Sequence, residues 1–337
     1  MLDNFEINEY KCFKDFKIDN LSQINIVSGK NNVGKTAFLE LVSIIENSQD
    51  LRLFKSNITS IFEARDLDID DINRYFENIN LMIKTFDNRV FIEHKIIDDL
   101  TDKEFLKIER YKNIIIDFLV MYKNNKLIEI IPLTREGSVI PRRIYRERIE
   151  TTFINSSKPN NSELTHLYSK VQDLGLESKE KFLEYLKLID NNIIHIEPQI
   201  RENRKSFLRI SLDNQEQSLI SSELGEGTNR FIEILCILLT NVNGTVLIDE
   251  IENGIHYTKL YDIWKAIIEI VQKENIQLFI TTHDRESIEA LNRASEDMNF
   301  DKISAITLER DDNNRIYPIV RKYNSFNITV DSGMDIR

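Results

Sequence analysis

The residues Ile26–Val42 read IVSGKNNVGKTAFLELV and carry the spacing G-x-x-x-x-G-K-T. Glycines in such a loop let backbone N–H groups turn inward toward phosphate oxygens, and the helix that follows adds its positive end. The lysine supplies a charge for the β- and γ-phosphates, and the threonine hydroxyl completes the shell of a magnesium ion. The alternative is a plain glycine turn. The sequence therefore predicts a site for ATP and Mg²⁺ built from Gly29, Asn31, Asn32, Gly34, Lys35 and Thr36.

Two further apolar runs end in side chains that could complete this chemistry. Asp249 and Glu250 follow TVLI, and His283 follows QLFITT. We expect Asp249 to reach the magnesium ion near Thr36, and Glu250 to act as the general base that polarises a water molecule attacking the γ-phosphate. His283 would touch the γ-phosphate, because ligands bind at the carboxyl ends of parallel strands. The alternatives are acidic residues that merely end a strand and a histidine that caps the next helix.

A second glycine-rich loop, SSELGEGTNRF, precedes a strongly apolar helix. A helix that begins after such a loop offers another place for phosphate. One ATP molecule does not need two such loops, so this loop is predicted to complete the ATP site of a neighbouring subunit, which makes the chain a homodimer or higher oligomer. The alternative is an ordinary helix cap. The residues concerned are Gly225, Glu226, Gly227 and Thr228.

The composition limits the other possibilities. The chain has 337 residues, 41% of them hydrophobic, and a formal net charge of -12, which argues against a globally basic surface for nucleic acid. Basic clusters at 141–148 and 201–205 could still meet phosphates, DNA, a phage product or an acidic partner, or could be solvated faces. Cys12 and Cys236 are far apart, which indicates neither a disulfide framework nor a zinc site. With no signal peptide or membrane span recognised, we expect a cytoplasmic protein that does not contact a membrane.

The hydrophobic pattern predicts the elements that position these side chains. Strands are expected at FEINEY, FKDFKI, INIV, TVLI and QLFIT, and helices at about 36–47 and within HYTKLYDIWKAIIEIVQK. Alternating strands and helices predict an α/β P-loop fold with a mixed, largely parallel sheet flanked by helices. Residues 51–189 change in pattern, with β-rich pieces and helices near 163–173 and 178–190, and are predicted to form an inserted α+β lobe. The nucleotide-binding head is then split between residues 1–50 and 190–337.

The order of these motifs resembles the ABC-type ATPase heads of SMC, RecF and OLD proteins. The segments LGEGTNR, LIDEIENGIHYTKLYDIW and QLFITTHDRESIEA look most like bacterial AAA-type ATPases, related to OLD, of anti-phage systems such as PARIS. The resemblance covers residues 1–50 and 190–337. It implies the roles given above, and it adds Lys11, which falls where relatives carry a cation for the α-phosphate; an exposed strand lysine is the alternative. One departure is that the serine of the usual signature loop is absent.

The resemblance also predicts a partner. SMC proteins insert long coiled coils between the P-loop and the signature loop, and the residues between these motifs lack sustained heptads. OLD nucleases carry a TOPRIM domain after the ATPase, whereas 54 residues follow His283 here. The leading hypothesis is therefore an ATPase that senses or scaffolds, and that controls a separate effector of the TOPRIM nuclease type in anti-phage defence. The alternatives are a RecF-like DNA-binding ATPase and a small-molecule kinase.

Overall fold

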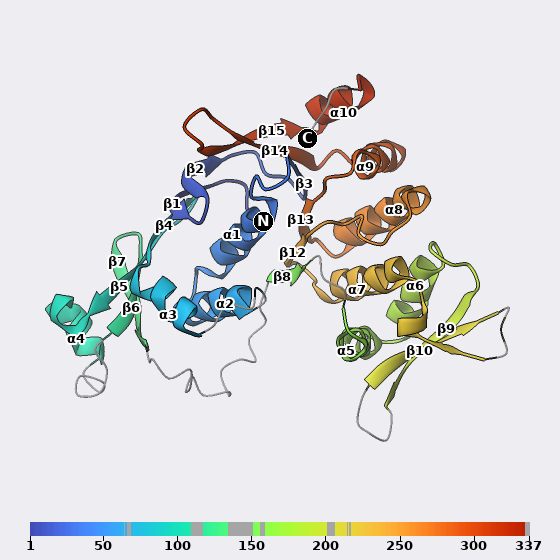
Figure 1. Ribbon diagram of the computed structural model, residues 1–337, viewed down its shortest axis with the longest axis horizontal. Coiled ribbons are helices and arrows are strands. Elements are labelled where there is room, and N and C mark those ends of the chain that lie inside the picture. Colours follow the sequence, from blue (N-terminus) through green and yellow to red (C-terminus); the bar gives the residue numbers. More distant parts are fainter. Residues whose placement is uncertain are drawn as a thin grey trace.

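The core of the protein is a six-stranded sheet with helices on both faces (Figure 1). The computed structural model describes residues 1–63, 65, 69–108, 117–133, 151–155, 159–200, 206–213, 215 and 217–333. The strand order of the core sheet is β15-β14-β3-β13-β12-β8. All neighbours are parallel except β14 and β15, which form an antiparallel hairpin. The bounds are β3 Ile24–Ser28, β8 Thr151–Ile154, β12 Thr245–Ile248, β13 Gln277–Thr281, β14 Ile303–Arg310 and β15 Ile316–Lys322.

Alternate residues of the core strands enter two separate hydrophobic clusters, because successive side chains of a strand point to opposite faces. In β13, Leu278 and Ile280 pack with α7, α8 and α9, whereas Phe279 packs on the other face near α1. The rings of Phe279 and Phe38 of α1 are 6.4 Å apart. The strands are thus buried on both faces, which accounts for their continuous apolar sequence. The bounds are α1 Lys35–Asn47, α7 Glu226–Thr240, α8 Tyr257–Lys273 and α9 Arg285–Asp297.

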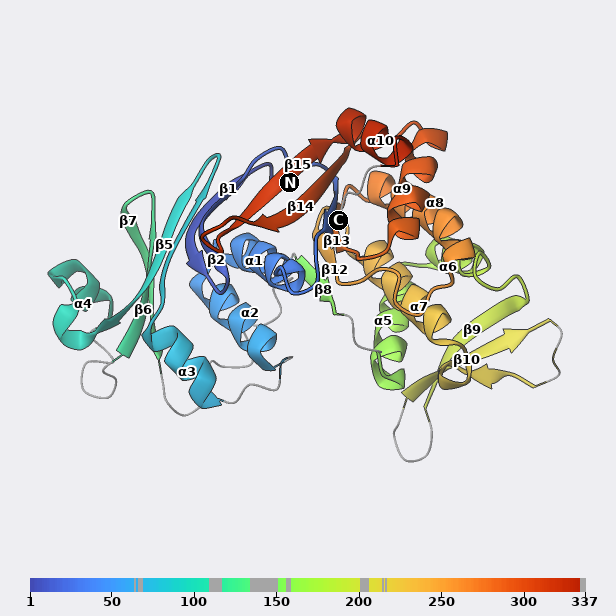
Figure 2. The same ribbon diagram turned by 45° about the horizontal axis from the view of Figure 1, so that its top comes forward.

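A second, antiparallel sheet stands beside α1 and α2, in the order β2-β1-β4-β5-β6-β7 (Figure 2). It crosses the predicted border at residue 50, because β4 pairs with β1, and β8 of the predicted lobe pairs with β12 of the core. The division into head and lobe stays a prediction. The bounds are β1 Phe5–Tyr10, β2 Phe13–Ile18, β4 Asn80–Thr85, β5 Arg89–Ile96, β6 Asp117–Lys123 and β7 Lys126–Leu133. The helices here are α2 Leu51–Glu63, α3 Ile69–Glu77 and α4 Asp102–Ile108.

The third sheet, β11-β10-β9, lies at the far end of the molecule and contacts α5 and α6, which in turn contact α7 (Figure 1). The bounds are α5 Asn161–Asp173, α6 Leu176–Leu186, β9 Ile193–Ile200, β10 Ser206–Leu212 and β11 Leu219–Ile220. A final helix, α10 Tyr323–Asp331, follows the β14–β15 hairpin and contacts it.

The predicted strands and helices around the motifs are present, and the mixed, largely parallel sheet is confirmed. The prediction of β-rich pieces after residue 51 was incomplete, because three helices, α2 to α4, also lie there. Among the described residues, no helix combines the length and the apolar character needed to cross a membrane. The basic clusters at 141–148 and 201–205 lie outside the described residues.

Candidate nucleotide site

The P-loop lies between β3 and α1, at the carboxyl edge of the core sheet. Gly34 has φ 105°, and a Cβ atom at this position would lie 2.9 Å from Sγ of Cys12, so a side chain here would be both strained and crowded. Helix α1 starts directly afterwards, with no side-chain cap and no acidic residue in its first turn. Its first N–H groups are therefore not engaged by a side-chain cap and are available to an anion.

The side chain of Lys35 is hydrogen-bonded to the backbone of the P-loop. Its Nζ atom donates to the carbonyl oxygen of Gly29 at 3.0 Å and to that of Lys30 at 3.4 Å. Burial lowers the pKa of Lys35, and the nearby carboxylates of Glu250, Asp249 and Glu252 oppose this effect. Phosphate oxygens are stronger acceptors than carbonyls for an ammonium group. If a triphosphate bound here, the ammonium group of Lys35 would exchange its hydrogen bonds to the loop carbonyls for hydrogen bonds to phosphate oxygens.

Thr36 and Asp249 meet although 213 residues separate them in the chain. The Thr36 hydroxyl donates to Oδ2 of Asp249 at 2.9 Å, and the Thr281 hydroxyl donates to Oδ1 at 2.5 Å. Within the described part of the chain, no group of three or more His, Cys, Asp or Glu side chains could hold a metal ion by itself. A hydroxyl and one carboxylate suit Mg²⁺, which prefers oxygen ligands and completes its octahedron with phosphates and water. These two residues fit the predicted magnesium site.

Glu250 follows the end of β12 in a left-handed backbone conformation, with φ 53°. Such a conformation is uncommon for a residue with a side chain and needs support from its surroundings. The backbone N–H of Glu250 donates to Oγ1 of Thr281 at 2.8 Å, and Nδ2 of Asn253 donates to Oε2 of Glu250 at 2.9 Å. The carboxylate is thereby held in one orientation at the cavity.

His283 follows the end of β13 and lies close to the carboxylates after β12. Its Nδ1 atom is 3.8 Å from Oε1 of Glu250 and 3.0 Å from Oε1 of Glu252. The predicted general base, Glu250, and the residue predicted to touch the γ-phosphate, His283, are therefore neighbours. Both line the same cavity as the P-loop.

This cavity has a volume of about 680 Å³, within the range of sites that bury small molecules. It contains Lys11, which the resemblance assigned to the site, and Arg65, which the sequence analysis did not assign. Arg65, from the segment after α2, and Lys11 both reach its wall and pair with buried Glu40 of α1, at 2.6 Å and 2.7 Å. Lys11 is thus held by a carboxylate, and its contact with an α-phosphate stays a prediction. The lining residues are Lys11, Cys12, Asn31, Asn32, Gly34, Lys35, Thr36, Ala37, Arg65, Asp249, Glu250, His283 and Arg310.

The signature loop does not contribute to the described lining of this cavity. Gly225 and Glu226 are exposed, Thr228 is half-buried, and Gly227 is buried. A Cβ atom on Gly227 would lie 2.2 Å from the carbonyl oxygen of Gly254, so glycine is required there by contact with the turn after β12. This packing does not test the prediction that the loop contacts the ATP of a neighbouring subunit.

Buried Arg230 links α7, the helix that follows the signature loop, to the carboxyl end of β12. It donates to the carbonyl oxygens of Asp249 and Asn155, both at 2.6 Å, and pairs with Glu233 at 3.0 Å. Sequence reasoning missed Arg230 and Thr281. Their types carry no motif, and only the adjacency of β12, β13 and α7 gives them partners.

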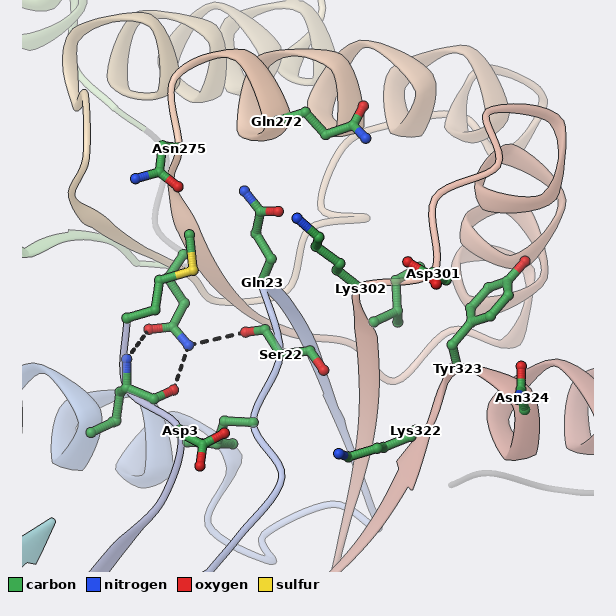
Figure 3. A pocket seen from close by; sticks show the side chains of 15 residues that line it. Asp3, Ser22, Gln23, Gln272, Asn275, Asp301, Lys302, Lys322, Tyr323 and Asn324 are labelled. Atoms are coloured by element: carbon green, nitrogen blue, oxygen red, sulfur yellow. Dashed lines mark hydrogen bonds between the residues drawn. The ribbon is translucent and has the colours of Figure 1, made fainter. Parts of the chain in front are cut away.

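A second cavity, of about 790 Å³, opens at the opposite edge of the core sheet (Figure 3). Gln23, Gln277 and Lys302 lie at the amino ends of β3, β13 and β14, and the P-loop and His283 follow the carboxyl ends of β3 and β13. Gln277 uses its amide on the backbone of Leu2 and Ser22, at 2.6–3.0 Å, which fixes the N-terminal segment to the sheet. Most of the residues predicted to bind ATP and Mg²⁺ line the first cavity, which has the smaller volume of the two.

The chain matches the family described as "AAA domain, putative AbiEii toxin, Type IV TA system" over residues 24–289, well over half of its length. The chain belongs to this AAA family. It is 21% identical over 388 aligned positions to a Helicobacter pylori protein named ATP/GTP phosphatase, and the alignment covers 97% of each chain. This distant relative therefore aligns with the ATPase over nearly the full length of both chains.

Solved structures confirm the fold class. The AAA protein resembles an SMC head bound to the C-winged helix domain of ScpA, with a TM-score of 0.54 and 9% identity, over 96% of this chain and 98% of that one. It also resembles the Smc head with an extended coiled coil bound to the C-terminal domain of ScpA from Pyrococcus furiosus. There the TM-score is 0.53 and the identity 7%, over 98% of each chain. The fold is that of an SMC-type or ABC-type ATPase head.

Proposed function

We propose that this AAA protein binds ATP with Mg²⁺ and hydrolyses it slowly. The observation that carries the proposal is the contact between Thr36 and Asp249, with Glu250 next to it at the rim of the same cavity. A hydroxyl after the P-loop lysine and a strand-end carboxylate form the two protein ligands of magnesium in nucleotide hydrolases. The name of the Helicobacter pylori relative, ATP/GTP phosphatase, supports the same reaction class.

Each residue of the site has a part in this reaction. Magnesium, when bound by Thr36 and Asp249, neutralises charge on the β- and γ-phosphates. Lys35 transfers its ammonium hydrogen bonds from the loop carbonyls to phosphate oxygens. Glu250, with Oε2 held by Asn253, keeps Oε1 to accept a proton from the attacking water. His283 senses the γ-phosphate from the end of β13.

We further propose that the protein oligomerises through its ATP sites and controls a separate effector, a nuclease of the TOPRIM type, in cytoplasmic anti-phage defence. Gly225 and Glu226 are exposed and lie outside the lining of their own cavity, which leaves them accessible to a neighbouring subunit's nucleotide. The SMC-head fold and the resemblance of the motifs to ATPases of defence systems support this assignment. ATP would then hold two subunits together, and hydrolysis would release them.

The test is the solution mass of Glu250→Gln by light scattering, with and without ATP and Mg²⁺. This variant should bind ATP without consuming it, so the mass should rise by an even multiple when ATP is added. Lys35→Ala is the control, since it should not respond. An unchanged mass in Glu250→Gln at saturating ATP would contradict assembly through the ATP sites.

A further inference from the structure

The carboxylate of Glu252 is largely buried, and the reaction proposed above assigns no role to it. Its side chain is 9% exposed, and its Oε2 atom is buried with no hydrogen-bond partner among the described residues. Burial raises the pKa of Glu252, and the backbone N–H of His283 opposes that effect. A buried carboxylate without full pairing is costly, so its partners indicate what it holds in place.

The closest polar contacts of Glu252 are both with His283, and its own backbone N–H and the Thr282 hydroxyl also lower its pKa. Oε1 of Glu252 accepts from the backbone N–H of His283 at 2.9 Å and lies 3.0 Å from Nδ1 of the same residue. One carboxylate oxygen thus fixes the main chain and the ring together, across 31 residues of sequence. The second carboxylate near the ring, that of Glu250, also faces Nδ1, at 3.8 Å. Nδ1 is therefore the ring nitrogen that faces the carboxylates.

We propose that Glu252 is the positioning residue of His283. An ionised carboxylate can only accept a hydrogen bond, so Nδ1 must carry the proton, and the hydrogen bond of one ring nitrogen sets the state of the other. In the neutral ring, Nε2 then carries a lone pair. A histidine held in this way by a carboxylate is the arrangement of a proton acceptor in other hydrolases. Glu252 thereby presents Nε2 as an acceptor for the hydrogen of a water molecule.

This role deepens the proposed function and, for its effect on turnover, rests on it. A neutral Nε2 cannot donate to a phosphate oxygen, so His283 would sense the γ-phosphate through the attacking water beside Glu250. The ring becomes a donor to phosphate only after it has received a proton. The assignment of the tautomer itself depends on the contacts of Glu252 alone and can be tested without nucleotide.

The experiment is ¹⁵N NMR of the histidine rings in the full chain at a pH where they are neutral. The chain has five histidines, and the signal lost in His283→Gln identifies the ring. We expect a proton-bearing Nδ1 in the wild type. Glu252→Gln should keep it, because the amide oxygen still accepts. Glu252→Ala should shift the ring toward the Nε2–H form, which an unconstrained histidine prefers.

Kinetics give the second readout. Glu252→Ala should lower kcat about 10-fold or more with KM for ATP nearly unchanged, as expected when a supporting hydrogen bond is lost, and Glu252→Gln should restore part of the loss. An Nε2–H ring in the wild type, or an Nδ1–H ring that persists in Glu252→Ala, would overturn the inference. A wild type without ATPase activity but with the expected tautomer would refute the proposed function instead.

Discussion

The buried pair Arg230–Glu233 on α7 gives a stability prediction that runs against the usual expectation for ion pairs. Arg230 has two carbonyl acceptors besides Glu233, whereas Glu233 gains its only described ion pair from Arg230. Burial outweighs this partner and raises the pKa of Glu233 from 4.5 to about 7. Ionisation of this carboxyl group is therefore less favourable in the folded chain than in the unfolded chain. The change to make is Glu233→Gln, which keeps the shape and removes the charge.

The size of the effect follows from the pKa. A rise from 4.5 to about 7 is worth about 3 kcal/mol at pH 8, since one pKa step equals about 1.4 kcal/mol. Between pH 4.5 and about pH 7, the folded chain binds the proton of Glu233 more tightly than the unfolded chain does. The wild-type contribution to the free energy of unfolding therefore falls as pH rises through this window and is constant above it. Glu233→Gln lacks this loss and should be more stable by about 1–3 kcal/mol at pH 8.

The assay is urea unfolding of wild type and variant at pH 5 and pH 8. At pH 5 the two free energies should nearly agree, because Glu233 is largely neutral in the folded wild type. Glu180→Gln, on the exposed surface of α6, is the matched control and should change nothing at either pH. A variant less stable than wild type by more than about 1 kcal/mol at pH 8 would refute the reasoning, because the ion pair would then outweigh the cost of burial.

Three further predictions concern the nucleotide site and the loop beside it. Gly227→Ala should destabilise the fold by about 1–3 kcal/mol, because its Cβ would lie 2.2 Å from a carbonyl oxygen, while Gly225→Ala has open space and should cost little; equal melting temperatures would contradict this. Cys12 lines the cavity and the other cysteine is buried, so ATP with Mg²⁺ should slow alkylation of Cys12 by a maleimide, and an unaffected rate would place ATP elsewhere. Asp249→Asn should lower kcat by about 100-fold or more in phosphate release, and raising Mg²⁺ should restore part of it.

The sequence was sufficient to predict the elements that are specified by short stretches of neighbouring residues. The P-loop, the helix after it and the buried strands β12 and β13 follow from short apolar runs and motif spacing, and the structure places them as predicted. Helix α2 was missed although its buried residues, Leu51, Phe54, Ile58 and Phe62, recur at helical spacing. No element was predicted at these residues from the sequence, and packing against α1 stabilises the helix.

The supporting residues of the site could not be predicted in the same way. Thr281 positions both Asp249 and the backbone of Glu250, yet this depends on β13 lying beside β12 in one register. Arg230 meets the carbonyl oxygen of Asp249 only because α7 packs under the same sheet. Such contacts depend on long-range packing, which a single sequence does not specify.

The central claim is that ATP is hydrolysed at the cavity between the P-loop and Glu250. The most direct measurement is steady-state phosphate release by wild type and Glu250→Gln, with ATP binding followed in parallel by protection of Cys12. The account predicts that the variant loses about 10²–10⁴-fold in kcat, the usual contribution of a general base, while ATP still protects Cys12. Turnover at the wild-type rate in Glu250→Gln would contradict it.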